Sequence, residues 1–181
     1  GLSPLYMKTL RNVFLFLLTC AVFLPLGCGY SRKTVLPKNI QTIHVGTFKN
    51  KIPAGDIYAY EPGLEIKITN AIIRRLHRDG NLQVVPEEKA DALLEGDLIG
   101  FNQEGLRFTG LERIEEYRLY VITALRLLDR KTGEVIWEEP NFSGDSSYFV
   151  LGSRATSRGE AAEKAIDRLA RHVVDRIVED W

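Results

Sequence analysis

Apolar residues recur at helical spacing in two stretches of the chain. In the first stretch, Leu64, Ile68, Ile72 and Leu76 are four residues apart, with charged residues between them. This stripe predicts an amphipathic helix over residues 64–78, which Gly80 ends because glycine readily adopts the left-handed conformation of a helix C-terminus. The second stretch follows the polar residues 152–159 and carries adjacent apolar pairs, at 161/162, 165/166, 169/170, 173/174 and 177/178. It predicts a long terminal helix with a broad apolar stripe.

Alternating or β-branched apolar runs predict strands before and between these helices. They cover residues 40–48, 82–85, 92–108, 117–128 and 134–148. The third run contains Gly96, Gly100 and Gly105, which predict bulges or bends. Residues 129–133 are typical of a tight turn, so the last three strands are expected to pair in meander order. The fold class is therefore α+β, with two helices packed on one face of a mixed, mostly antiparallel sheet.

The strand at residues 117–128 is apolar on both faces. Leu119, Val121 and Leu125 share one face, and Ile122 and Leu128 share the other. Because two helices cover only one face of such a sheet, something else has to cover the second. Either the loop at 50–63 or the segment 148–157 folds over it, or a partner protein does; the pattern leaves both open.

The first residues have the features of a secretory signal. Lys8 and Arg11 precede residues 13–26, which carry no charge. At about 1.5 Å per residue this run is roughly 21 Å long, short of a hydrocarbon core of about 30 Å. It predicts a signal peptide over residues 1–27. Met7 stands directly before the basic pair, so translation is expected to begin there, with residues 1–6 upstream.

The signal ends in a sequence that resembles a bacterial lipobox, residues 24–28 with Gly27 before Cys28. The resemblance implies that the Cys28 thiol carries diacylglycerol and that the new amino terminus is acylated, for example with palmitate. The alternative is an ordinary signal peptide with Cys28 a stray thiol. Cys20 would leave with the signal, so Cys28 would have no disulfide partner, which favours lipid attachment. We expect residues 28–38 to be a linker and residues 39–181 a single α+β domain.

Composition and motifs argue against several function classes. The chain has 24 basic and 24 acidic residues, and this balance disfavours recognition of nucleic acid through net charge. His44, His77 and His172 are scattered and lack metal-ligand spacing, so no metal site is expected. No nucleophile motif with a partner base is present either. The sequence therefore predicts a protein that is not an enzyme and needs no cofactor.

Several short segments, in their order and spacing, resemble the LptE family of lipopolysaccharide-assembly lipoproteins. They are residues 28–30 (Cys-Gly-Tyr), 36–37 (Leu-Pro), the strand at 40–48, 90–96 (Ala-Asp-Ala-Leu-Leu-Glu-Gly), 116–119 (Glu-Tyr-Arg-Leu) and 179–181 (Glu-Asp-Trp). The resemblance implies a two-layer domain with a sheet of about four strands, lipid-anchored at the periplasmic face of the outer membrane. It also implies a plug and assembly factor inside an LptD-type β-barrel translocon, with lipopolysaccharide as a ligand.

The meander suggests where such a ligand would bind. If the last three strands alternate in direction, Arg107, Arg113, Arg154 and Arg158 gather at one end of the sheet. Guanidinium forks suit phosphate groups, so these arginines are candidates for binding the phosphorylated glucosamines of lipid A. The alternative is that they are solvated charges partnered by Glu112, Glu115 and Glu160.

A second function remains open, because other outer-membrane lipoproteins with an α+β domain regulate periplasmic cell-wall synthases. Such regulators reach inward on a long tether. The linker here has about ten residues, which gives a reach of roughly 15 to 20 Å and favours a partner in the same membrane.

Overall fold

The computed structural model describes residues 40–53, 55, 61–110 and 113–178. The chain divides into two compact units, residues 1–33 and 34–181, and all described residues belong to the second. The predicted signal peptide, the start at Met7, the lipid attachment at Cys28 and the linker lie outside the described residues. In the part of the chain that the structure describes, no helix is both long and apolar enough to cross a membrane.

The described unit is α+β, as predicted. Its elements follow in the order β1 (Thr42–Val45), β2 (Lys49–Asn50), α2 (Leu64–Asp79), β3 (Gln83–Val84), the 3₁₀ turn η1 (Glu87–Lys89), β4 (Ala92–Phe108), β5 (Ile114–Asp129), β6 (Val135–Phe149) and α3 (Arg158–Val178). The sheet order is β3-β1-β4-β5-β6, with β2 also pairing with β4. The predicted meander is confirmed, since β4, β5 and β6 are antiparallel neighbours, whereas β1, β2 and β3 form parallel pairs.

The sheet has six strands, so the expectation of about four is corrected. One reason is that the strand expected at residues 40–48 ends at Val45 as β1, and a separate short strand, β2, follows at residues 49–50. The N–H of Gly46 still donates to the Leu94 carbonyl, but the N–H of Phe48 turns to the hydroxyl of Thr69 on α2. The Phe48 ring is buried. The chain therefore leaves the sheet edge to place this ring in the core and then rejoins β4.

Both helices form where their apolar stripes predict. Helix α2 ends at Gly80, which has a φ of 81° and donates its N–H to the Leu76 carbonyl. Helix α3 begins after Ser157, whose hydroxyl accepts the N–H of Glu160 while the Glu160 carboxylate accepts the N–H of Ser157. This reciprocal capping box satisfies two of the unpaired donors at a helix start. It fixes where the polar segment after β6 becomes helical.

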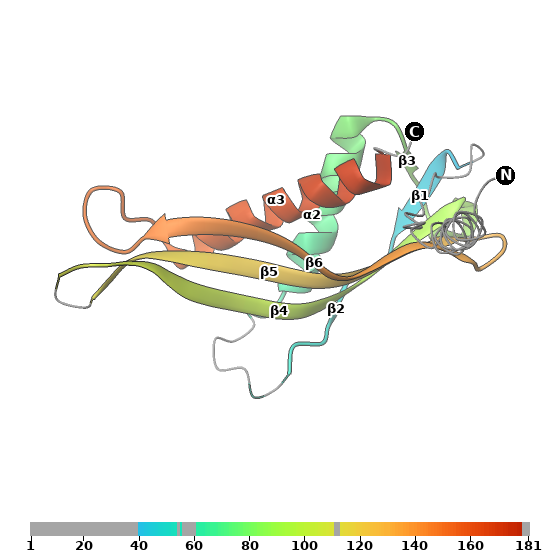
Figure 1. Cartoon of the computed structure of the whole chain (residues 1–181). Helices are drawn as coiled ribbons and strands as arrows, with labels where there is room; N and C mark the ends of the chain where they lie inside the picture. The colour runs from blue at the N-terminus through green and yellow to red at the C-terminus, as the bar shows by residue number, and fades with distance from the viewer. Residues whose placement is uncertain (1–39, 54, 56–60, 111–112, 179–181) are drawn as a thin grey trace, which may run out of the picture. The chain divides into compact units, whose positions relative to one another are not determined.

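The helices lie together on one side of the sheet (Figure 1). Helix α3 packs along β6 so closely that a Cβ on Gly144 would collide with the Ala165 carbonyl and the Leu169 amide. The stripe of small residues on α3, with Ala161, Ala162, Ala165 and Ala170 all buried, permits this approach. The hydrophobic core is the layer between helices and sheet.

The glycines of β4 do different things. Register shifts lie between Leu98 and Gly100 and just after Gly105, so bulges are confirmed at these two positions. Gly96 is different, because it pairs regularly with Leu125, and the bulge or bend expected there is wrong. A Cβ at position 96 would overlap the Phe48 ring. The absence of a side chain at Gly96 therefore makes room for the Phe48 ring.

The second face of the sheet carries an apolar ladder interrupted by charges. Leu93 is paired with Leu128, Glu95 with Arg126, and Asp97 with Ala124. These side chains are half-buried or exposed, and among the described residues no helix covers them. The segment after β6 pairs instead with the end of that strand, at Phe149 and Ala155.

Candidate functional site

The end of the sheet where β4 meets β5 and β6 meets α3 holds the predicted arginines. We call residues 105–110, 113–117 and 148–158 the sheet tip. Figure 1 shows it at the left, where the β4–β5 hairpin reaches past the start of α3. Two register shifts between Gly105 and Phe108 distort the end of β4, and the Thr109 N–H closes the turn on the Arg113 carbonyl at 2.8 Å.

Two of the four arginines share one aromatic ring. The guanidinium carbon of Arg154 lies 4.2 Å from the centre of the Phe149 ring, and that of Arg107 lies 5.9 Å from it. Stacking of this kind is a cation–π contact, and it leaves the edges of the guanidinium groups available for anions. Arg107 also lies near the Glu116 carboxylate, with Nε and Oε2 3.7 Å apart. The sheet tip therefore holds two cations around an aromatic centre.

The segment that carries Arg154 is held to the strands by backbone hydrogen bonds. The N–H of Val150 donates to the Glu115 carbonyl, and the N–H of Thr156 donates to the Phe149 carbonyl. Gly152, with a φ of 81°, allows the tight reversal between them. Because this segment is tied at both ends, Arg154 is placed over Phe149 by the backbone.

Arg158 lies deeper than the other arginines. As the first residue of α3, it places its guanidinium carbon 5.0 Å from the centre of the Phe101 ring. Nearby, the Tyr148 hydroxyl donates to the Gln103 side-chain oxygen at 2.9 Å, and the Tyr148 and Tyr117 rings stack at 5.7 Å. Burial raises the pKa of Tyr148, while the charge of Arg158 opposes that shift. Arg158 thus belongs to an aromatic layer that supports the sheet tip from below.

The ion-pair partners of these arginines differ from the acids that the sequence suggested. Arg113 is exposed beside the turn, and the carboxylate that approaches Arg107 is that of Glu116. Glu160, one of the expected partners, caps α3. Glu112 lies outside the described residues.

Sequence reasoning missed the apolar part of the sheet tip. Four of the large hydrophobic side chains exposed in the described chain gather here: Leu106, Phe108, Val150 and Leu151. Phe108 is 60% exposed, more than any of the others. The bulges in β4 hid this signal, since alternation no longer says which face a residue occupies once the register has shifted. Exposed apolar side chains beside arginines suit an amphiphile with an anionic head group.

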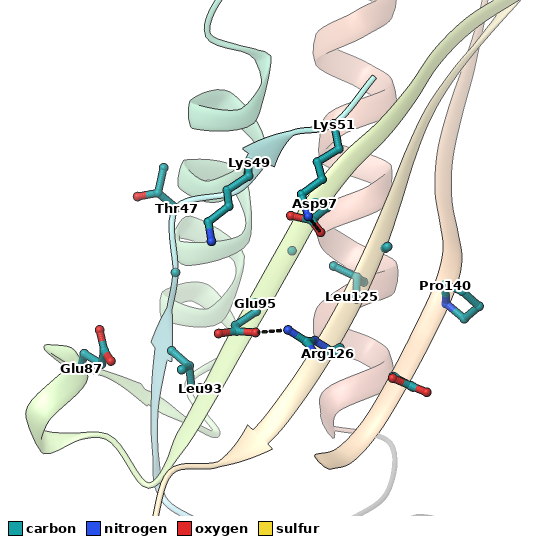
Figure 2. Close-up of a pocket in the computed structure, with 14 residues that line it drawn as sticks. Thr47, Lys49, Lys51, Glu87, Leu93, Glu95, Asp97, Leu125, Arg126 and Pro140 are labelled. Atoms are coloured by element: carbon teal, nitrogen blue, oxygen red, sulfur yellow. Dashed lines mark hydrogen bonds and ion pairs between the residues drawn. The ribbon is translucent and has the colours of Figure 1, made fainter. Parts of the chain in front are cut away.

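A groove with a volume of about 540 Å³ lies on the open face of the sheet (Figure 2). The Arg126 guanidinium and the Glu95 carboxylate are 2.7 Å apart across its floor, and Lys51 lies 3.1 Å from Asp97. Charges of both signs line it, and they neutralise one another. Paired charges of both signs give a ligand of one sign little net attraction, so this groove does not suit one charged ligand.

The Ala90-Asp91-Ala92 string has a structural role. One oxygen of Asp91 accepts the Thr42 hydroxyl at 2.8 Å and the amides of Gln41 and Thr42, and the other lies 3.1 Å from the Lys131 ammonium. The Thr42 hydroxyl, the Gln41 amide and Lys131 lower the pKa of Asp91 to about 2. Asp91 therefore ties the start of β1 to β4 and to the β5–β6 turn.

Among the residues that the structure describes, no cluster of histidine, cysteine or acidic side chains has the geometry to hold a metal ion. The sheet tip offers cations and exposed apolar side chains, which suit a ligand with both anionic and apolar parts.

The chain is similar to known proteins in sequence and in fold. A sequence model of the LptE family, described as lipopolysaccharide-assembly, matches residues 40–181. No curated protein sequence matches the chain. Among solved structures, protein XCC0632 from Xanthomonas campestris is similar with a TM-score of 0.57 at 13% identity, covering 80% of this chain and 87% of its own. The hypothetical protein CT253 from Chlamydia trachomatis has a TM-score of 0.52 at 11% identity, covering 77% and 99%. These structural likenesses show the fold alone.

Proposed function

Because the chain belongs to the LptE family of lipopolysaccharide-assembly proteins, we propose that it plugs and helps assemble an LptD-type β-barrel translocon and binds lipopolysaccharide during export. The family is one of outer-membrane lipoproteins, and the proposal places the domain at the periplasmic face on acyl chains attached to Cys28. The observation that carries the ligand part is the meeting of arginines and exposed apolar side chains at the sheet tip.

The open sheet face supports the plug. Half-buried apolar side chains alternate there with ion pairs, as at Leu93, Glu95 and Arg126. A barrel wall in contact with this face would remove the apolar surface from water, at roughly 25 cal/mol per Å². The charges would fix the orientation of the domain, since mismatched like charges at an interface are costly.

The chemistry of the sheet tip supports lipopolysaccharide as ligand. Lipid A joins phosphorylated glucosamines to acyl chains, and the sheet tip sets Arg107 and Arg154 beside Phe108 and Leu151. Guanidinium groups bind phosphate through paired hydrogen bonds, and the apolar side chains suit the acyl chains. Arg113, exposed beside the turn, would add a further phosphate contact.

Charge reversal at the sheet tip tests the ligand. Purified protein with Arg107→Glu and Arg113→Glu is expected to bind lipopolysaccharide at least tenfold more weakly in a direct titration. A matched control, Arg130→Glu with Lys164→Glu, makes the same change in net charge away from the sheet tip. Unchanged affinity of the first variant at low salt would contradict the proposal, because charge contacts are strongest there.

The anchor and the partner need separate measurements. Mass spectrometry of the native amino-terminal peptide is expected to show an acylated Cys28, and a bare thiol would contradict the anchor. Purification of the lipidated protein from outer membranes is expected to recover a large barrel protein. Recovery of a glycosyltransferase in its place would favour the regulator of cell-wall synthesis.

A further inference from the structure

The helix layer carries a small cleft between α2 and α3 on the side away from the sheet. Its volume is about 90 Å³, roughly three times the share of one water molecule in the liquid. The residues that line it are Ala71, Arg74, Arg75, Arg78, Asp167, Ala170 and Arg171. The two alanines are buried and leave space at the helix contact, whereas Arg74, Arg78 and Arg171 are exposed around it.

The charges around this cleft are unbalanced. At either side the two helices neutralise each other, because Lys67 lies 2.9 Å from Glu163 and Arg75 lies 3.6 Å from Asp175. Around the cleft itself, four arginines line the space with Asp167 as the one acid among the lining residues. Arginines in the last turn of a helix complement its dipole, but Arg74 and Arg171 are not in a last turn.

Arg75 supplies an independent observation. Its Nε is buried and finds no hydrogen-bond partner among the described residues. The contact with Asp175 runs through Nη2, and at 3.6 Å it is longer than an N–H···O hydrogen bond. Arg75 lines the cleft and its side chain is 30% exposed, so its guanidinium group keeps N–H donors that this one long contact does not satisfy.

We infer that the cleft binds a phosphoryl group. Four guanidinium groups outnumber the neighbouring acids Asp167 and Asp175 and attract an anion, and an oxyanion would accept their exposed N–H groups. The space suits one tetrahedral anion, and any group attached to that anion would lie outside it. Because a phosphate presents oxygens in several directions, it can meet arginines from both helices at once, whereas a carboxylate presents two oxygens in one plane. Free phosphate and the phosphate of a lipid head group share this chemistry.

The arginine Nε–H resonances of the full ¹⁵N-labelled chain in non-ionic detergent test the inference. Titration with inorganic phosphate is expected to shift the Arg75 resonance, assigned with Arg75→Lys, in a saturable manner. Arg74→Gln with Arg171→Gln is expected to weaken this binding at least tenfold. Both positions are exposed and glutamine is a good helix former, so the fold should persist.

A matched control removes two arginines elsewhere, Arg126→Gln with Arg130→Gln, and is expected to bind phosphate like the unmodified chain. The same shift with sodium chloride at equal ionic strength, or no loss in the Arg74 and Arg171 variant, would overturn the inference and assign the space to water. Glycerol 3-phosphate and glucosamine 1-phosphate identify the source, since tighter binding of either than of inorganic phosphate indicates a head group. Variants of the sheet tip leave this cleft unchanged, so the experiment tests phosphate binding at the cleft independently of the proposed function.

Discussion

The ring of Phe48 lies against the backbone of Gly96, in the space that the Cβ of any other residue at position 96 would occupy. The two residues come from different elements, and the contact is possible because the chain leaves the sheet edge between β1 and β2. The Phe48 N–H is at the same time bound to Thr69 on α2. One aromatic side chain therefore joins the edge of the sheet to the helix layer.

Gly96→Ala is expected to destabilise the domain by about 1–3 kcal/mol, because the new methyl group overpacks against a ring that is held in place. Urea unfolding measures the change. Gly159→Ala, in the first turn of α3 where a Cβ meets nothing closer than 3.8 Å, is the control and should cost nothing. Adding Phe48→Leu to Gly96→Ala should recover part of the loss, and strictly additive effects would contradict the contact.

Gly144→Ala is expected to cost more than Gly96→Ala, on the order of 3 kcal/mol or above. Here the added Cβ meets the backbone of α3 at Ala165 and Leu169, and the whole helix has to shift. Urea unfolding and hydrogen exchange of α3 amides report it. Gly100→Ala, which meets only the Ile122 side chain at 3.2 Å, should be milder, and equal losses at the two positions would count against this account.

Stability is expected to depend on the ionisation of Asp91. Its folded pKa of about 2 lies below the ordinary value of 3.8, so the folded state favours the carboxylate. This contribution, about 1–2 kcal/mol, is fully present above pH 4 and is lost as the pH falls toward 2. The difference in unfolding free energy between the unmodified chain and Asp91→Asn should shrink across that interval. A difference that stays constant from pH 6 to pH 2 would contradict it.

Ser157→Ala removes the hydroxyl that caps α3 and is expected to cost about 0.5–2 kcal/mol. The first turn holds Arg158 over Phe101, so fraying should also raise the exchange rate of amides at the start of α3. Ser147→Ala on β6, an exposed position, is the matched control. If both variants unfold at the same urea concentration, the capping box adds no stability.

The two kinds of side chain at the sheet tip are expected to respond differently to salt. Phe108→Ser should weaken lipopolysaccharide binding by a similar factor at low and high salt, because it removes apolar contact. Arg107→Gln should weaken binding mainly at low salt, since the charge interaction is screened at high salt. Titrations at two ionic strengths measure both effects. Identical salt profiles would show that the arginine and the phenylalanine do not act on separate parts of the ligand.

Local signals were sufficient for the helices and the meander. The stripe at Leu64 to Leu76 and the stop at Gly80 define α2 within one residue, because both depend on neighbouring positions. The meander in turn brings Arg107 and Arg154 to the same end of the sheet. The residues next to Gly96 in the sequence do not predict its contact with Phe48, because that contact depends on packing between distant segments.

The composition of the sheet tip was predicted only in part for a related reason. The arginines stand out by charge. Leu106 and Phe108 have the sequence pattern of ordinary strand residues, and the bulges in β4 are what expose their side chains. The cleft between the helices was equally hidden. Arg74 and Arg171 come from elements about a hundred residues apart, and only the packing of Ala71 on the same seam as Ala170 brings them together.

The position of β1 also affects the order in which the domain can assemble. Ile43 pairs with Val84 on one side and with Ala92 on the other, and both partners follow it in the chain by some forty to fifty residues. The hairpins of β4, β5 and β6 form between segments adjacent in sequence and can form early. In contrast, β1 has to pair with β3 and β4, which are distant from it in the sequence. A chain that emerges amino terminus first would thus carry β1 unpaired until residues 83–94 had followed it.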